Sequence, residues 1–409
     1  MNSPAHGSRR VIRWISPGLV AGWIGLASQG AFPAIVTDSG LVEGKTDSSV
    51  TVFKGLPFAM PPVGRLRWRA PEPPAAWQGV REASTFSPRC PQTGAYPPES
   101  PQEPTSEDCL YLNIWVPNGS PSTPLPVMVW FYGGALENGS ASIPLYWGNR
   151  LAEHGVIVVS ANYRLGALGF LAHPALSRES DMRVSGNYGL LDQIAALQWV
   201  QRNIAAFGGD PGRITIFGQS SGAISVSALV VSPLAKGLFQ RAIGESGGLF
   251  EPLTIAREYS LRGAEAEGID FVRQSGAGTL EHLRQMPVAE LLKVPFHPHV
   301  VIDGFALRAS PYDVYAGGQQ NDVDILVGSN ATEGRLFLGG KSITVNNYTQ
   351  ILSADFPSML VRLLAPSPGD NGATALAAAG AFEGDMRFRW DMWTWARLAA
   401  RTGSKGVYF

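Results

Sequence analysis

A serine flanked by glycines is the residue pattern in this chain with the clearest chemical potential. Residues 218–222 read Gly-Gln-Ser-Ser-Gly and fit the pattern Gly-x-Ser-x-Gly. The run Ile214–Phe217 before them is short, apolar and β-branched, as in a buried strand, and Ala223–Val231 after them has no Pro or Gly to interrupt a helix. Strand, sharp turn and helix in this order predict a nucleophile elbow. On such a turn the hydroxyl of Ser220 is exposed for nucleophilic attack, and the N–H of Ser221 points at the oxyanion that develops.

The same five-residue pattern occurs a second time, so the pattern alone does not identify a nucleophile. Residues 244–248 read Gly-Glu-Ser-Gly-Gly. Only two apolar residues precede them directly, and the following glycines and Pro252 prevent a long helix from starting at once. These features favour Ser220 as the nucleophile, and Ser246 is the alternative.

A pair of glycines that follows another buried strand is suited to complete the site. The run Val127–Phe131 is wholly apolar, and Tyr132, Gly133 and Gly134 come directly after it. Paired glycines at the end of a strand expose consecutive backbone N–H groups, which is what an oxyanion hole requires. Because such a pair is often only a turn, this prediction depends on the elbow at Ser220.

The other apolar runs predict how these turns are positioned. A third buried strand is expected at Val156–Ser160, and an amphipathic helix at Gly189–Phe207 leads into the elbow. Strands alternating with helices indicate an α/β fold with a parallel sheet and crossover helices. Further strands are predicted at Phe239–Ile243, Ile325–Gly328 and Gly406–Phe409, and mostly helical segments, suited to cap the sheet, at 255–295 and 345–402.

Length and composition bound the class of protein. The 409 residues suffice for one large domain or two ordinary ones. The net charge of −1 gives no basic surface for binding nucleic acid or anionic lipid. Two cysteines and scattered histidines have no metal-site spacing, so neither a metal nor another cofactor is predicted.

The first 34 residues are predicted to be an export signal rather than part of the fold. A basic segment at Ser8–Arg13 precedes an apolar span at Trp14–Ala27, and small residues suited to cleavage follow at Ser28–Ala34. The paired arginines leave a twin-arginine signal and a general secretory signal both open. Residues 35–409 are then expected to form a secreted or periplasmic domain without a membrane-inserted segment.

The two cysteines, Cys90 and Cys109, are expected to pair. An even count of cysteines in an exported chain indicates a disulfide. The segment between them is rich in Pro, Ser and Gln and is predicted to be a loop. A bond that closes a loop of about 20 residues stabilises a fold by about 3 kcal/mol.

Several blocks of the chain resemble one family, the type-B carboxylesterases, which contains bacterial para-nitrobenzyl-type esterases, bile-salt-stimulated lipase and cholinesterases. Both long signatures of that family are matched, one at 207–222 and the other, Glu-Asp-Cys-Leu-Tyr-Leu-Asn, at 107–113. Shorter blocks that look like the family lie at 58–64, 162–166 and 186–193, and the likeness extends from about residue 37 to the end. The resemblance implies an α/β-hydrolase fold: a mostly parallel central sheet with helices on both faces and helical cap insertions, with the last strand and helix missing. It also implies a serine carboxylic-ester hydrolase that acts through an acyl-enzyme.

Carried over position by position, the resemblance assigns roles to single residues. It implies a nucleophile at Ser220, the acidic triad member at Glu333, oxyanion N–H groups at Gly133, Gly134 and Ser221, a hydroxyl partner of the acid at Ser246, and a disulfide between Cys90 and Cys109. The chain departs from the usual family residues at Gln219, Tyr132, Ala135 and Ser221, where Glu, His, Gly and Ala are more common. An amide at position 219 keeps most of the hydrogen bonding, and a serine at position 221 keeps the backbone donor.

The base of the triad is the largest departure from the family. In this fold the order along the chain is Ser, then the acid, then His, so the base should follow residue 333. All six histidines come before it, at positions 6, 154, 173, 282, 297 and 299. We therefore expect the sequence to be truncated at its C-terminus, before the histidine. A base relocated to His297 or His299 is the alternative.

Two classes of function follow from this pattern. The first is an ester hydrolase that turns over poorly as a 409-residue chain, because a serine hydroxyl is a weak nucleophile without a positioned base. The second is a catalytically inactive binding or adhesion protein of the same fold. The intact set of Gly133, Gly134, Ser220 and Glu333 favours the first. Near-neutral charge and many aromatic residues favour an uncharged or mildly hydrophobic small ester as its substrate.

Overall fold

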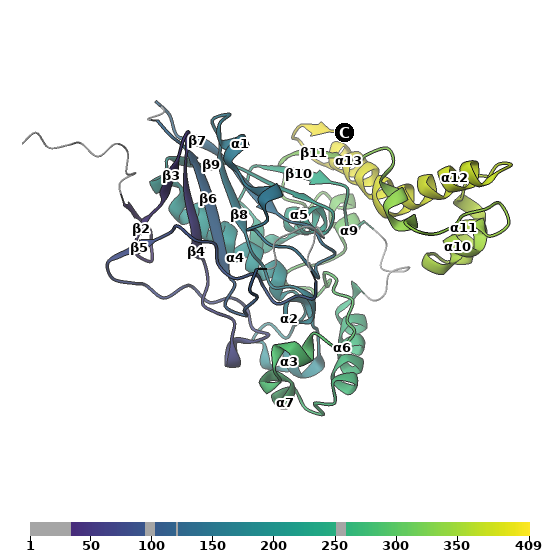
Figure 1. Cartoon of the computed structure of the whole chain (residues 1–409), viewed down its shortest axis with the longest axis horizontal. Helices are drawn as coiled ribbons and strands as arrows, with labels where there is room; N and C mark the ends of the chain where they lie inside the picture. The colour runs from purple at the N-terminus through teal and green to yellow at the C-terminus, as the bar shows by residue number, and fades with distance from the viewer. Residues whose placement is uncertain (1–33, 95–102, 120–121, 251–258) are drawn as a thin grey trace, which may run out of the picture. The chain divides into compact units, whose positions relative to one another are not determined.

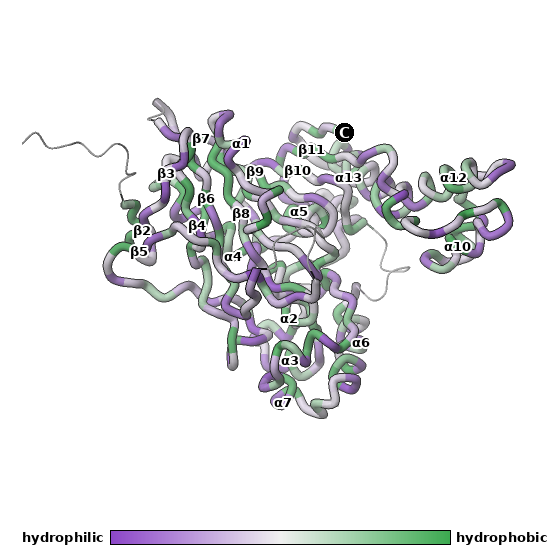
Figure 2. The backbone as a smooth tube through the Cα atoms, in the orientation of Figure 1, coloured by the Kyte–Doolittle hydropathy of each residue, from purple (hydrophilic) through white to green (hydrophobic). Residues whose placement is uncertain are grey.

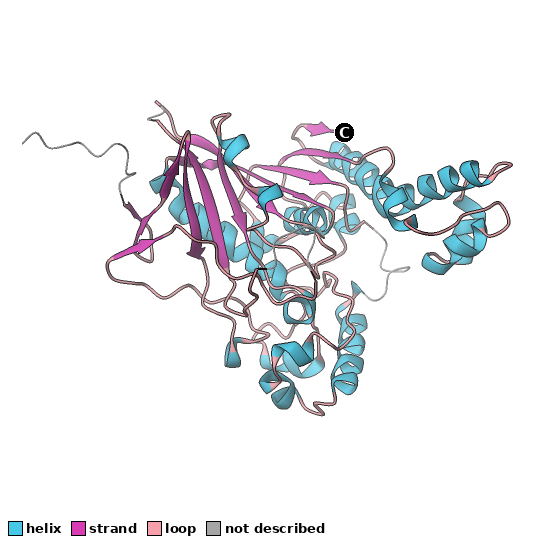
Figure 3. Ribbon diagram, viewed as in Figure 1, coloured by secondary structure: helices cyan, strands magenta, loops and turns pink. Residues whose placement is uncertain are grey.

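The computed structural model describes residues 34–94, 103–119, 122–250 and 259–409. All but the last residue of the predicted export signal therefore lies outside the described residues. The described residues form one mixed sheet of nine strands and a separate sheet of three strands (Figures 1 and 3). None of the helices in these ranges has the length and hydrophobicity that crossing a bilayer requires.

The strands of the large sheet follow the order β12-β11-β10-β9-β7-β8-β6-β4-β3. Pairing is parallel from β12 to β8 and antiparallel from β8 to β3. The small sheet has the order β1-β2-β5. The strands are β1 (Ile35–Val36), β2 (Leu41–Glu43), β3 (Lys45–Asp47), β4 (Val50–Pro57), β5 (Val80–Glu82), β6 (Tyr111–Pro117), β7 (Leu125–Phe131), β8 (Ile157–Ala161), β9 (Gly209–Gln219), β10 (Arg241–Glu245), β11 (Asp324–Gly328) and β12 (Val407–Tyr408).

Helices cross over between the parallel strands and flank the sheet. The helices are α1 (Asn149–Ala152), α2 (Gly166–Phe170), α3 (Pro174–Glu179), α4 (Tyr188–Asn203), α5 (Ser221–Val231), α6 (Leu261–Ser275), α7 (Leu280–Gln285), α8 (Val288–Leu291), α9 (Pro311–Ala316), α10 (Tyr348–Asp355), α11 (Ser358–Leu364), α12 (Gly372–Gly384) and α13 (Trp390–Thr402). A 3₁₀ segment, η6 (Glu333–Leu338), follows β11, and a π-helical turn (Asp385–Arg389) joins α12 to α13.

Burial along β8 shows that the sheet is covered on both faces. All five residues of this strand are buried. Ile157 and Val159 pack into the main hydrophobic core, which includes residues of α4 and α5, whereas Val158 packs with Ala152 of α1 and Trp115 on the other side. Successive side chains of a strand point to opposite faces, so helices lie on both faces, as the sequence predicts. Figure 2 shows hydrophobic residues running along the middle strands of the sheet.

The two segments predicted to be helical have small apolar cores of their own. Helices α6, α7 and α8 contribute to a cluster that also contains Trp68, Leu171 and Tyr188. Helices α10, α11 and α12 share a second cluster around Leu352 and Phe382, and they lie together beyond α13 in Figure 1. The predicted helical content of these two insertions is confirmed.

Element boundaries differ from the predictions at a few points. Strand β9 begins at Gly209, five residues before the apolar run, because the residue pairs with Leu125 at the start of β7. The predicted helix at Gly189–Phe207 ends its α-helical part at Asn203 and finishes as a 3₁₀ turn. Hydrophobic pattern marks buried positions, whereas these boundaries depend on hydrogen bonds to neighbouring strands and turns.

Candidate active site

The residues with predicted roles lie after the carboxyl ends of adjacent parallel strands. Strand β9 pairs with β7 on one side and with β10 on the other, and β10 pairs with β11. The turn at Gly133 follows β7, Ser220 follows β9, Ser246 follows β10, and Glu333 lies five residues after the end of β11. The carboxyl edge of a parallel sheet is where open α/β folds place their ligands.

Ser220 occupies a sharp turn between β9 and α5. Its backbone has φ 56° and ψ −127°, a left-handed conformation that non-glycine residues rarely adopt. The turn is held by two backbone hydrogen bonds: the N–H of Ser220 donates to the carbonyl of Glu245 (2.9 Å), and its carbonyl accepts from Ile224 (3.0 Å). A strained backbone in a strand–turn–helix unit is the geometry of a nucleophile elbow, so the predicted local structure is confirmed.

The glycines on either side of this turn are sites of close backbone approach. A Cβ added to Gly218 would lie 2.6 Å from the carbonyl carbon of Gly222. A Cβ added to Gly222 would lie 2.9 Å from the carbonyl oxygen of Tyr132 and closer still to that of Phe131. Ordinary van der Waals contact begins at 3.4 Å, so only glycine allows α5 to start this close to the end of β7.

The glycine turn after β7 lies directly against the elbow. A Cβ on Gly133 would lie 3.0 Å from Cβ of Ser220. In the described part of the chain, no hydrogen bond engages the N–H of Gly133, Gly134 or Ser221. The last of these is the first residue of α5, where the helix dipole adds positive potential. Free N–H groups on both sides of a hydroxyl are suited to stabilise negative charge on an atom bonded to it.

Glu333 is fixed by two hydrogen bonds to its Oε1 atom. The hydroxyl of Ser246 donates to it over 2.5 Å, and the N–H of Asn330 donates to it as well. Ser246 is buried, has φ 55°, and donates its own N–H to the carbonyl of Gly328 (2.9 Å). These contacts orient the carboxylate of Glu333, which is half-buried, at the end of β11.

The loop that carries Glu333 is packed against α12. A Cβ on Gly334 would lie 2.9 Å from Cβ of Glu383 and closer still to backbone atoms of Gly380 and Gly384. The side chain of Glu383 is fully buried and forms an ion pair with Arg387 (2.6 Å) in the π-helical turn. Sequence reasoning missed this support, because glycines 46 and 50 residues away carry no local signal of contact.

No histidine of the described residues hydrogen-bonds to Ser220 or Glu333. His173 caps α3, where its Nδ1 accepts the N–H of Ala175 (3.1 Å), and burial lowers the pKa of His173 below its usual value. His299 lies 3.0 Å from a carboxylate oxygen of Glu267. His154, His282 and His297 lie at the end of α1, in α7 and in the loop after α8, and His6 lies outside the described residues.

The predicted disulfide is confirmed. Cys90 and Cys109 are bonded, with a Cα–Cα distance of 5.1 Å. Both residues are fully buried, and Cys109 lies two residues before β6. The bond therefore ties the loop that precedes β6 to the main hydrophobic core, to which both cysteines belong.

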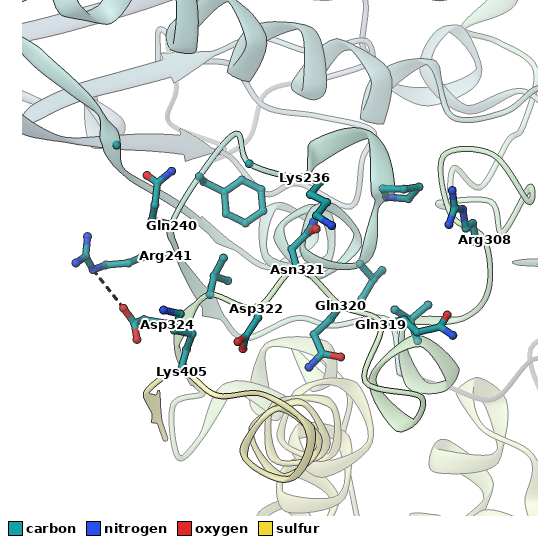
Figure 4. Close-up of a pocket in the computed structure, with 17 residues that line it drawn as sticks. Lys236, Gln240, Arg241, Arg308, Gln319, Gln320, Asn321, Asp322, Asp324 and Lys405 are labelled. Atoms are coloured by element: carbon teal, nitrogen blue, oxygen red, sulfur yellow. Dashed lines mark ion pairs between the residues drawn. The ribbon is translucent and has the colours of Figure 1, made fainter.

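A cavity of about 760 Å³ lies at the opposite ends of the strands (Figure 4). Its lining includes Arg241 and Asp324, the first residues of β10 and β11, which form an ion pair at 3.7 Å. Ser220 and Glu333 follow the carboxyl ends of their strands, so this cavity is not part of the candidate active site.

An elbow serine at the carboxyl edge of this sheet defines an α/β-hydrolase fold. The chain belongs to the carboxylesterase family, whose model, described as "Carboxylesterase family", matches residues 31–373. It is 43% identical over 381 residues to fumonisin B1 esterase of Sphingopyxis macrogoltabida, covering 87% of this chain and 70% of that protein. It is 41% identical over 326 residues to para-nitrobenzyl esterase of Bacillus subtilis (strain 168), covering 74% of this chain and 63% of that protein.

A solved structure of PNB esterase matches with a TM-score of 0.78 and 35% identity, covering 90% of this chain and 77% of that chain. The fold predicted from the family resemblance is therefore confirmed. The aligned part of this chain spans less than two thirds of the para-nitrobenzyl esterase and 70% of the fumonisin B1 esterase. The predicted roles of Ser220, Glu333, Gly133, Gly134 and Ser221 stay predictions.

Proposed function

We propose that this protein is a serine carboxylic-ester hydrolase that works through a covalent acyl-enzyme. The observation that carries the proposal is the position of Ser220. It lies on a left-handed turn, with Gly133 packed against it and the Ser246–Glu333 pair after the ends of the next two strands, β10 and β11. Oγ of Ser220 attacks the ester carbonyl, the alcohol leaves, and water then releases the acid from the serine.

The backbone N–H groups of Gly133, Gly134 and Ser221 are proposed to bind the oxyanion of the tetrahedral intermediate. Within the described residues these three N–H groups donate no hydrogen bond, which supports this assignment. Donors of this kind, already in place before the reaction, each contribute about 10²- to 10³-fold to the rate. Because the first helical residue of α5 is one of them, the helix dipole acts in the same direction.

The base is proposed to be a histidine that is not among the six of this chain, oriented by the carboxylate of Glu333. Each described histidine lies elsewhere in the fold, and His173 and His299 already have hydrogen-bond partners. Removing the base from a comparable triad costs about 10⁶-fold in rate, whereas an oxyanion hole alone retains about 10³-fold over water. The 409-residue chain is therefore expected to hydrolyse esters slowly.

The substrate is proposed to be a small, uncharged or mildly hydrophobic ester. The net charge of −1 supplies no field that would attract a strongly charged molecule. Two relatives carry names that refer to esters of a small molecule, fumonisin B1 and para-nitrobenzyl. The disulfide between Cys90 and Cys109 supports a secreted or periplasmic location, because such bonds persist in oxidising compartments.

A catalytically inactive binding or adhesion protein of the same fold is the second candidate. The observation that favours it is that none of the described histidines is hydrogen-bonded to Ser220. A binding protein has no need for free N–H groups beside a serine hydroxyl. In an esterase Ser220 reacts with the substrate, whereas in a binding protein it does not, so the reactivity of Ser220 distinguishes the two candidates.

Reaction of Ser220 can be tested on the 409-residue chain with 4-nitrophenyl butyrate, with and without added imidazole. Imidazole in solution replaces the missing general base if the rest of the site is intact. Imidazole also cleaves activated esters by itself, so the rate with Ser220→Ala is subtracted. We expect turnover near background without imidazole and a Ser220-dependent rise with it.

A fluorophosphonate probe gives an independent readout, with the labelled peptide located by mass spectrometry. Labelling is expected at Ser220, to be lost in Ser220→Ala and only weakened in Ser246→Ala. Equal hydrolysis and labelling by the parent and Ser220→Ala would refute the proposed enzyme and leave the binding protein. Labelling at Ser246 would transfer the nucleophile to the second Gly-x-Ser-x-Gly turn.

A further inference from the structure

The turn after β7 has a backbone that its own residues do not favour. Gly134 has φ 118°, and the next two residues, Ala135 and Leu136, have φ 55° and 60°. Residues with a Cβ rarely adopt this left-handed conformation, and two in succession are rarer still. Such a backbone persists only where the surroundings hold it in place. Groups outside the turn must therefore restrain it.

One restraint is the side chain of Ser221. Its Oγ accepts the N–H of Leu136 over 3.1 Å, across 85 residues of sequence. The serine is 2% exposed and Leu136 is 3% exposed, so water does not compete for this bond. Because Ser221 directly follows Ser220, the bond joins the elbow to the far end of the glycine turn.

A second restraint passes through Tyr163. Its hydroxyl donates to the carbonyl of Tyr132 over 2.6 Å, and its ring stacks on the ring of Tyr132 with centroids 4.5 Å apart. A tyrosine hydroxyl has one proton, and here it goes to the carbonyl that directly precedes the glycine pair.

Two buried hydrogen bonds then restrain the glycine turn, one at each end. The N–H of Leu136 donates to the hydroxyl of Ser221, and the hydroxyl of Tyr163 donates to the carbonyl of Tyr132. Tyr132 and Leu136 lie on the two sides of Gly133 and Gly134. This pair of bonds, from here on the serine clamp, holds the glycine turn at both ends from within the core.

We infer that Ser221 is a positioning residue, whose hydroxyl holds the N–H groups of Gly133 and Gly134 at the elbow through the serine clamp. The inference rests on the proposed function for its catalytic consequence. It assigns to the side chain of Ser221 a task separate from that of its backbone N–H. Alanine at this position keeps the backbone donor but leaves the N–H of Leu136 without a partner in a buried place.

Hydrogen exchange measured by mass spectrometry tests the restraint without any need for activity. Ser221→Ala is compared with Ser227→Ala, a matched control in the same helix: Ser227 is equally buried, and its hydroxyl donates only to the carbonyl of Ile224 (2.7 Å). We expect peptides covering residues 132–138 to exchange at least about tenfold faster in Ser221→Ala and at the parental rate in the control. Tyr163→Phe should also accelerate hydrogen exchange in the same peptides.

Kinetics test whether the restraint serves the reaction. In imidazole-supported hydrolysis of 4-nitrophenyl butyrate, Ser221→Ala should lower kcat about tenfold with KM unchanged, because an oxyanion contact exists only in the transition state. Faster exchange with an unchanged kcat would overturn the positioning role. Parental exchange in Ser221→Ala would overturn the serine clamp whether or not the chain hydrolyses esters. Absence of Ser220-dependent turnover in the parent would instead refute the proposed function, and exchange alone would then decide whether Ser221 holds the turn.

Discussion

Gly222→Ala sets two opposing effects against each other at the elbow. The residue lies in the first turn of α5, where alanine in place of glycine favours the helix by about 1 kcal/mol. The added Cβ, however, would lie 2.9 Å from the carbonyl oxygen of Tyr132 and closer still to that of Phe131, whereas ordinary contact begins at 3.4 Å. Both neighbours are backbone atoms, which cannot rotate out of the way as a flexible side chain can.

The cost of the steric clash should exceed the gain in helix propensity. Helix α5 and the end of β7 must separate by about 1 Å, and overpacking of this kind costs up to about 3 kcal/mol. After the gain from helix propensity, we expect the free energy of unfolding to fall by about 2 kcal/mol. The same movement separates the N–H of Ser221 from that of Gly133, and a misplacement of about 1 Å costs about 10²-fold in rate.

Urea unfolding followed by tryptophan fluorescence measures the first effect, and imidazole-supported ester hydrolysis measures the second. Gly328→Ala is the matched control: it lies at the end of β11, near the same site, and an added Cβ there meets no atom within 4 Å. Its unfolding free energy should stay within about 0.5 kcal/mol of the parent. A Gly222→Ala chain as stable as the parent, or more stable, would refute the claim that glycine is needed for the close approach.

Three further predictions concern the framework of the site. Replacing Cys90 and Cys109 together by serine should lower the unfolding free energy by about 3 kcal/mol in urea titrations, and reductant should then have no further effect. Asp192→Asn should cost about 3–5 kcal/mol in the same assay, because Asp192 accepts two hydrogen bonds, of 2.8 and 2.7 Å, from the guanidinium of the buried Arg164. A loss below 1 kcal/mol would contradict the view that Asp192 balances a buried charge. Burial lowers the folded-state pKa of His173, so the stability from its neutral capping form is present above its usual value of 6.5 and is lost as pH falls through the folded pKa. His173→Asn keeps a cap that does not titrate, so we expect its unfolding free energy to fall less between pH 7.5 and 5 than that of the parent, and equal pH profiles would contradict the capping role.

The sequence predicts well those parts of the fold that depend on neighbouring residues. Buried strands such as β7 and β9 are marked by runs of apolar residues, because both faces of a parallel sheet are covered. The elbow at Ser220 is marked by its two glycines, because a close approach of strand and helix requires the absence of a Cβ at fixed spacing. These signals are local, so they can be read without knowing which distant segments meet.

Contacts between distant segments could not be predicted from the residues themselves. Ser246 and Glu333 are 87 residues apart, and their pairing was expected only from the family resemblance. The bond between Ser221 and Leu136 is not among the predictions, which assign to Ser221 only a backbone donor. A hydroxyl carries no spacing pattern that names its partner, which becomes visible only once the strands are in register.

Strand register also gives a physical account of why the Gly-x-Ser-x-Gly pattern occurs twice. Gln219 at the end of β9 is directly paired with Glu245 at the end of β10, so the serines that follow both lie at the same level on adjacent strands. Both have a left-handed backbone, and each donates its N–H to a carbonyl of the next strand, Ser220 to Glu245 and Ser246 to Gly328. The two turns therefore have the same backbone geometry, one strand apart.

The two turns differ in what surrounds the serine hydroxyl. The hydroxyl of Ser246 is buried and donates its proton to Glu333, whereas no hydrogen bond within the described ranges engages that of Ser220. A serine whose proton is already given to a carboxylate supports that carboxylate, and only the serine with a free hydroxyl beside free N–H groups is suited to attack a carbonyl.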